Sequence, residues 1–175
     1  KLGIIIKQTK TVETLGSATV ICTDKTGTIT ENRMQLAEIF VFKTGQFLNP
    51  GQWKTPEGVE LLTIAMWASE PVAFDPMEVA LHSAYEAATD ADVRQHYKLI
   101  HEYPLSGKPP MMTHVFEDSK GHRIIAAKGA PESIMRYAGL TSNQNTQATE
   151  ALTQMLNKGY RVLAVGQTHF EGNDF

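Results

Sequence analysis

Two β-prone runs separated by a three-residue turn limit the folds that this chain can adopt. The runs are T-H-V-F-E-D at residues 113–118 and H-R-I-I-A-A-K at residues 122–128, with S-K-G at 119–121 between them. Two such runs joined by a short segment that contains glycine are typical of a β-hairpin. The sequence therefore predicts an antiparallel strand pair in the second half of the chain.

Helices and further strands are expected on both sides of this hairpin. Thr55 and Asp75 suit the N-cap position, and each is followed by a proline, which is favoured in the first helical turn. Apolar spacing predicts strands at 18–23, 35–42, 97–103 and 161–165, helices at 55–69, 75–88 and 131–137, a connector at 43–55, and a polar linker at 141–147 before a helix that ends near Lys158. Together these elements indicate an α+β fold, an antiparallel twisted sheet with flanking helices.

Composition narrows the class of protein. With 175 residues, 42% hydrophobic and 20% charged, the chain is long and apolar enough for one domain, or one domain and a fragment. A net charge of −3 without a basic stripe argues against a nucleic-acid partner. The single Cys22 excludes an internal disulfide, the six histidines lack a metal-ligand spacing such as H-x-x-x-H, and no apolar run spans a bilayer.

A candidate phosphate site lies near the start of the chain. The apolar run at 18–23 leads into D-K-T-G-T, residues Asp24, Lys25, Thr26, Gly27 and Thr28. A strand would fix the Asp24 carboxylate at a sheet edge, where α/β folds place ligands, and Gly27 would let the backbone approach a phosphate closely. Asp24 is then a candidate nucleophile. The alternative is a plain turn, since these are common turn residues, but the whole string behind an apolar strand favours the phosphate site.

Several motifs resemble one known family. D-K-T-G-T-I-T at 24–30 is similar to the signature of the P-type ATPases, ion pumps that are phosphorylated on an aspartate. Further motifs resemble the family in the same order: D-P-M-E-V-A-L at 75–81, Y-P-L-S-G-K-P-P-M-M at 103–112, K-G-A-P-E at 128–132 and G-Y-R-V-L-A-V at 159–165. The long segment that bears D-P-x-E and K-G-A-P-E resembles the calcium, proton and sodium-potassium branches.

The resemblance implies two domains. Residues 1–32 would be the end of the stalk and the first strand and loop of a truncated α/β phosphorylation domain, and residues 33–175 the nucleotide-binding domain. Asp24 would attack the γ-phosphate of ATP, and Asp24 and the backbone carbonyl of Thr26 would hold Mg²⁺. The family's later motifs, T-G-D and G-D-G-x-N-D, do not occur in this sequence, so this chain is not expected to phosphorylate itself.

The resemblance also assigns the nucleotide contacts. Those expected on the nucleotide-binding domain are Glu78, Leu105, Lys108, Lys128, Gly129 and Arg161. Glu78 would lie in the adenine pocket, although with Asp75 it could instead form a capping box. Lys128 and Arg161 would reach the nucleotide and its phosphates, whereas without a ligand both would be ordinary surface charges. Leu105 stands where the family usually has an aromatic residue, and Lys108 would replace a basic residue of that loop, so weak ATP binding is expected.

The implied protein is a cation pump of which this chain is a part. Its partners would be ATP and the phosphorylation, actuator and transmembrane domains of the same polypeptide, at the cytoplasmic face of a membrane. The chain itself would be a monomer that is not inserted into the membrane. Two alternatives remain. One is a haloacid dehalogenase-type phosphatase or phosphotransferase, which usually has D-x-D, with a second aspartate at the position of Thr26 in this chain. The other is a non-catalytic nucleotide-sensing module.

Overall fold

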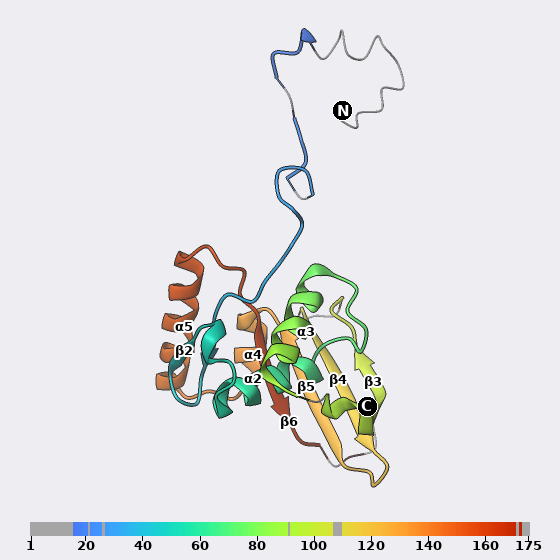
Figure 1. Ribbon diagram of the computed structural model, residues 1–175. Coiled ribbons are helices and arrows are strands. Elements are labelled where there is room, and N and C mark those ends of the chain that lie inside the picture. Colours follow the sequence, from blue (N-terminus) through green and yellow to red (C-terminus); the bar gives the residue numbers. More distant parts are fainter. Residues whose placement is uncertain are drawn as a thin grey trace. The chain divides into compact units, whose positions relative to one another are not determined.

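The structure is a computed structural model that describes residues 16–20, 22–25, 27–90, 92–106, 110–170 and 172 (Figure 1). The chain divides into two compact units, Lys1–Arg33 and Met34–Phe175. All β-strands found in the described residues belong to the second unit. The assignment of residues 1–32 and 33–175 to two domains of a pump stays a prediction.

A four-stranded antiparallel sheet forms the centre of the second unit. Its strands, in the spatial order β3-β4-β5-β6, are β3 (Tyr97–Tyr103), β4 (Met111–Asp118), β5 (Arg123–Gly129) and β6 (Ala164–Thr168). The β4–β5 hairpin is the one that the sequence predicts, and its turn is closed by the Asp118 carboxylate, which accepts the backbone N–H groups of Lys120 and His122 at 2.8 Å. Gly121 supplies the positive φ of 83° that this turn needs.

Helices flank the sheet (Figure 1). Their bounds are α2 (Pro56–Trp67), α3 (Pro76–Ala88), α4 (Pro131–Tyr137) and α5 (Ser142–Asn157), with short 3-10 helices at Pro50–Gln52 and Val93–His96. Two of them, α2 and α4, pack on the strands β5 and β6 of the sheet. The two predicted N-caps are confirmed: the Thr55 hydroxyl accepts the N–H of Gly58 at 3.3 Å, and the Asp75 carboxylate accepts that of Met77 at 2.7 Å. Among the described helices, none combines the length and apolar character needed to cross a bilayer.

The register decides which strand residues face the helices. Residues directly opposite each other in an antiparallel pair lie on the same face, so His114 and Phe116 of β4 share a face with Ala126 of β5. Phe116 and Ala126 pack with Trp67 and Ala68 at the end of α2. Lys128 lies two residues after Ala126 and therefore on this same face, near the end of α2.

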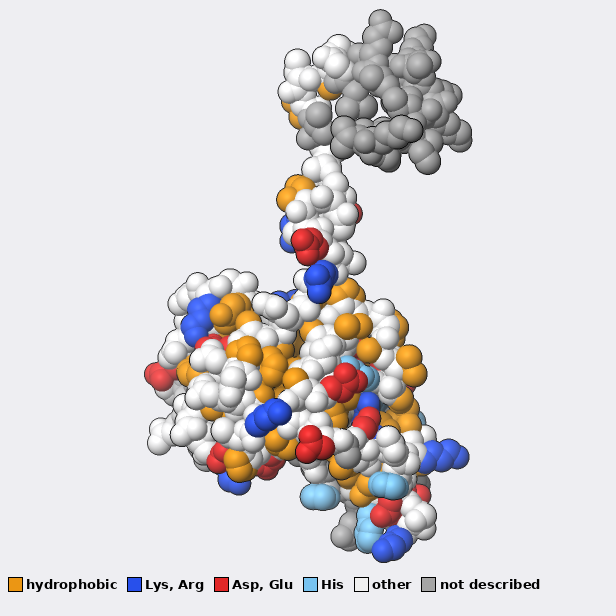
Figure 2. Space-filling model, in the orientation of Figure 1, with side chains coloured by type: hydrophobic (Ala, Val, Ile, Leu, Met, Phe, Trp, Pro, Cys, Tyr) orange, Lys and Arg blue, Asp and Glu red, His pale blue; other side chains and the backbone are white. Residues whose placement is uncertain are grey.

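A second core cluster lies between α2, α3 and a small two-stranded sheet. That sheet is β1 (Ile39–Val41) paired with β2 (Gln46–Leu48). The cluster consists of Ile39, Val41, Leu48, Trp53, Leu62, Met66, Ala84 and Tyr85. On the outside, acidic and basic side chains are interspersed over the visible face of this unit (Figure 2).

Four predicted elements differ from those in the structure. The expected strand at 18–23 is absent from its described residues, which are exposed coil, because no described segment pairs with it to form a ladder. The strand expected at 35–42 is only β1, and the expected connector at 43–55 contains β2 and a 3-10 turn. The positive φ of Gly45 (69°) lets the chain reverse there. The last strand begins three residues later than the predicted 161–165.

The polar linker predicted at 141–147 is wrong. Helix α5 begins at Ser142, because Thr141 forms a capping box with Gln144: the Thr141 hydroxyl accepts the N–H of Gln144, and the Gln144 side chain accepts that of Thr141. These two bonds satisfy backbone donors that the first helical turn leaves without partners. A run rich in Ser, Asn and Thr can thus begin a helix when such a box is present.

Candidate functional site

A buried polar cluster joins Lys128, Glu78 and Ser69. The ammonium of Lys128 forms an ion pair with the Glu78 carboxylate and donates to the Ser69 hydroxyl at 3.3 Å. Ser69 in turn donates to the backbone carbonyl of Ala65 at 2.7 Å. The three residues are 7%, 3% and 0% exposed, respectively. Lysine and glutamate are rarely this buried unless they are paired.

Each member of the cluster is positioned by its secondary structure. Glu78 stands in the first turn of α3 because Asp75 caps that helix, and the positive end of the helix dipole there favours a carboxylate. Its side chain is directed to Lys128 rather than back to Asp75. Lys128 lies near the end of the inner strand β5, where it pairs with Met112 of β4 and Val165 of β6.

The cluster carries a buried positive charge and an acceptor oxygen that could both bind a ligand. Burial lowers the pKa of Lys128 to about 8, while the negative charges of Asp75 and Glu70 act in the opposite direction. The adjacent Glu78 carboxylate also favours the ammonium form, so Lys128 is charged at neutral pH. The other carboxylate oxygen of Glu78, Oε2, is buried and has no hydrogen-bond partner in the described part of the chain. Buried acceptors of this kind are uncommon, and a ligand that carries an N–H donor would satisfy this one.

Gly129 is required by the close approach of a neighbouring strand. A Cβ at this position would lie 2.6 Å from the Met111 Cβ and 2.7 Å from the backbone carbonyl oxygen of Pro110. These distances are too short for any side chain without a backbone shift. Strand packing therefore explains why a glycine stands at position 129. Its expected role beside a nucleotide stays a prediction.

Leu105 and Arg161 lie at the same end of the sheet as Gly129. Leu105 follows the end of β3, and Arg161 precedes the start of β6, where Ala164 pairs with Gly129. Leu105 is 54% exposed, and Arg161 is also exposed. Both side chains are thus accessible to a ligand at this end of the sheet, while neither joins the buried cluster. Lys108 lies outside the described residues.

The predicted phosphorylation loop belongs to the first unit and has the geometry of a turn. Asp24, Lys25, Gly27 and Thr28 are exposed, and Thr26 lies outside the described residues. The carbonyl of Lys25 accepts the N–H groups of Ile29 and Thr30 at 3.0 Å, and Gly27 has a positive φ of 75°. The chemical role of this loop stays a prediction.

Ser69 is a member of the cluster that sequence reasoning missed. The residue follows the last turn of α2, and its hydroxyl bonds a carbonyl of that helix, which is a common fate of serine. None of the motifs quoted from the sequence includes Ser69. Its contact with Lys128 joins residues 59 positions apart and depends on how α2 packs on β5.

Comparison with known proteins identifies the family. Residues 69–175 match the family described as P-type ATPase, cytoplasmic domain N. A probable cation-transporting P-type ATPase of Mycoplasma genitalium is 31% identical, over 94% of this chain and 18% of that protein. A calcium-transporting ATPase of Bacillus subtilis is 29% identical over 92% of this chain and 22% of its own length. Plasma membrane ATPase 2 of Saccharomyces cerevisiae is 26% identical over 99% of this chain and 18% of its own length.

This chain spans about a fifth of the length of these relatives, in which it matches 18–22%. The family matched covers more than half of the chain, and it includes Ser69, Lys128 and Arg161. The resemblance drawn from D-K-T-G-T and K-G-A-P-E is confirmed. The chain belongs to the P-type cation-transporting ATPases and contains their cytoplasmic, nucleotide-binding N domain.

Proposed function

We propose that residues 33–175 bind ATP at the Lys128–Glu78–Ser69 cluster and present its γ-phosphate to Asp24 within an intact cation pump. The observation that carries this proposal is the buried Lys128, held charged by Glu78 in a domain of this family. An ammonium fixed in a region of low dielectric attracts an anionic ligand more strongly than one in water. Because its orientation is already set, little ordering is needed on binding.

The exposed residues at the end of the sheet complete the proposed site. Glu78 Oε2 would accept an N–H of the ligand, for which the adenine amino group is the candidate. Leu105 would contact the base by apolar packing alone, without ring stacking, so the affinity is expected to be weak. Arg161 would bind phosphate oxygens through the fork of its guanidinium, and Lys108 would add positive charge nearby.

In the intact pump Asp24 would act as the nucleophile. One oxygen of its carboxylate would bond to the γ-phosphorus while the bond to the β–γ bridging oxygen breaks, which releases ADP. Lys25, Gly27 and Thr28 would stabilise the phosphate oxygens. Asp24 and the carbonyl of Thr26 are oxygen ligands of the kind Mg²⁺ takes, and the exposure of Asp24 is compatible with this role. The ion would supply positive charge against the phosphates.

The larger assembly follows from the family. Aspartyl phosphate formed on Asp24 would couple ATP hydrolysis to cation transport at the cytoplasmic face of a membrane. The partners would be the phosphorylation, actuator and transmembrane domains of the same polypeptide. The chain by itself is proposed to be monomeric. Neither the haloacid dehalogenase-type enzyme nor the nucleotide-sensing module is favoured by any feature of the described residues.

Replacing Arg161 with glutamine tests the phosphate contact. We expect Arg161→Gln to weaken ATP binding by about tenfold, the equivalent of one charge-assisted hydrogen bond. Arg136→Gln is the matched control, since Arg136 is also an exposed arginine, at the end of α4. Isothermal titration calorimetry with ATP measures both. Equal affinities for the two variants would contradict the assignment of Arg161.

The second test concerns Asp24. The 175-residue chain is expected to bind ATP without retaining a phosphoryl group, since its sequence lacks the later acidic motifs that would complete the Mg²⁺ site. The measurement is incubation with γ-labelled ATP and Mg²⁺ followed by acid precipitation, with Asp24→Asn as the control. A stable label present in the wild-type chain and absent from the variant would contradict this expectation.

A further inference from the structure

His114 is a buried histidine whose ring nitrogens both lack partners. It is 0% exposed in the middle of β4, and neither Nδ1 nor Nε2 has a hydrogen-bond partner among the described residues. Its ring contacts the ring of Phe116 edge to face, with centroids 5.9 Å apart. Burying polar atoms without partners costs free energy, and each such group in a folded protein calls for an explanation.

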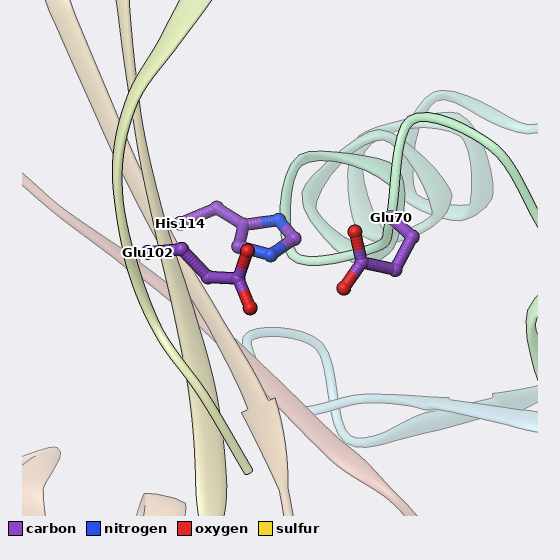
Figure 3. Close-up of side chains that lie close together, drawn as sticks. All are labelled: Glu70, Glu102 and His114. Atoms are coloured by element: carbon purple, nitrogen blue, oxygen red, sulfur yellow. The ribbon is translucent and has the colours of Figure 1, made fainter.

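Two carboxylates face this ring from different elements. Glu102 stands at the end of β3 and Glu70 in the loop after α2. One ligand atom from each of the three residues lies within 4.8 Å of the other two. In Figure 3 the imidazole projects from β4 between the carboxylate of Glu102 and that of Glu70.

An irregularity in the sheet places Glu102 opposite His114. Leu99 pairs with Phe116, but the next pair is His101 with Val115, so Ile100 is an extra residue in β3. Without this bulge His101 would oppose His114, and Glu102 would lie on the other face of the sheet. Bulges commonly re-aim a side chain in this way.

The backbone of Glu70 is held in place by two side chains from elsewhere in the chain. Its backbone carbonyl accepts the Nε2–H of His82 at 3.0 Å and an N–H of Arg94 at 3.4 Å. Arg94 is itself oriented by an ion pair with Asp92 at 2.9 Å. The loop that carries the Glu70 carboxylate is therefore anchored to two neighbouring elements.

We propose that His114, Glu70 and Glu102 bind a divalent transition-metal ion of the Zn²⁺ class. One imidazole nitrogen and two carboxylate oxygens are ligands that Zn²⁺ accepts at about 2.0–2.2 Å, and three protein ligands leave a position for water. The two carboxylates balance the charge of the ion. Mg²⁺ is disfavoured because it prefers oxygen ligands alone. Glu102 is exposed, so it gives an ion a route to the buried ring.

The proposed metal site and the nucleotide cluster have no residue in common. Ser69 binds Lys128 of the nucleotide cluster, whereas the next residue, Glu70, belongs to the metal site. Metal binding needs neither ATP nor Asp24, so it is tested without nucleotide. The result therefore does not depend on the function proposed above.

The test is a titration of the full 175-residue chain with ZnCl₂ by calorimetry, together with CoCl₂ by visible absorption. We expect one high-affinity ion per chain, a Co²⁺ band typical of four- or five-coordination, and a ¹⁵N shift of the His114 ring. Because His114 is buried, Glu102→Gln at an exposed position carries the test. It should weaken Zn²⁺ binding by at least about tenfold, the lower end of losses around metal sites, with an unchanged circular dichroism spectrum.

His122→Gln is the matched control. The exposed His122 ring lies 2.8 Å from the Asp118 carboxylate at the β4–β5 turn, which makes it the obvious place for adventitious metal binding. The variant should keep the wild-type affinity. No high-affinity binding, unchanged affinity in Glu102→Gln, or binding lost in His122→Gln would each overturn the proposal. Mg²⁺ that binds as tightly as Zn²⁺ would also overturn it, since an imidazole ligand favours Zn²⁺ over Mg²⁺.

Discussion

Replacing Lys128 with methionine is expected to destabilise the chain by about 3–5 kcal/mol, because it leaves a buried carboxylate without its counter-charge. It should also abolish ATP binding, because the ammonium that would attract the nucleotide is removed. Glu78 is 3% exposed and its ion-pair partner is Lys128. Methionine fills the same volume without the charge, so the loss is electrostatic and not a cavity. Urea denaturation measures the stability, and calorimetry with ATP measures the binding.

The double variant Glu78→Leu, Lys128→Met is the control for this experiment. Replacing both members of a buried ion pair by apolar side chains is often neutral or stabilising, so most of the lost stability should return. ATP binding should not return, because the ammonium is still missing. A single variant as stable as the wild type would contradict the buried ion pair. A double variant that binds ATP normally would contradict the site.

Substituting Gly129 with alanine is expected to cost about 1–3 kcal/mol, the usual range for overpacking a well-packed region. The new Cβ would lie 2.6 Å from the Met111 Cβ, so β4 and β5 would have to move apart. For a chain of this size the melting temperature should fall by roughly 2–4 °C per kcal/mol. Differential scanning calorimetry gives both quantities.

Gly166→Ala is the matched control on the adjacent strand. A Cβ there would lie 3.6 Å from Ile134 Cγ2, an ordinary contact, so stability should stay within about 0.5 kcal/mol or rise slightly. The pair of variants also distinguishes two possible roles of Gly129, strand packing and ligand binding. If Gly129→Ala kept full stability and lost only ATP binding, the glycine would serve the ligand and not the strand packing.

The parts of the fold that could be predicted depend on residues close together in sequence. The β4–β5 hairpin follows from two β-prone runs around Gly121, and the starts of α2 and α3 follow from Thr55 and Asp75, each before a proline. These features carry their own hydrogen bonds, so a short window contains the information needed.

The elements that could not be predicted depend on partners elsewhere or on competing local signals. The run at 18–23 has strand composition, but a strand needs a neighbour to pair with, and none is found in the described residues. At Thr141 the polar composition favours a linker, while the capping box with Gln144 favours a helix. The local hydrogen bonds prevail there.

The candidate sites show the same division. Lys128 and Glu78 were expected from family motifs, and the structure joins them in an ion pair. The position of Glu102 opposite His114 requires the bulge at Ile100, which no spacing rule for metal ligands anticipates. A search for histidines at fixed intervals therefore misses a site built from two strands and a loop.

Titrating the ¹⁵N-labelled chain with ATP and following the amide chemical shifts tests the proposed binding of ATP at the Lys128 cluster. We expect saturable shifts at Glu78, Leu105, Lys128 and Arg161, and none at the β4–β5 turn around Gly121, at the far end of the hairpin. Shifts that are absent from the four named residues, or that gather around α4 and α5 instead, would contradict it.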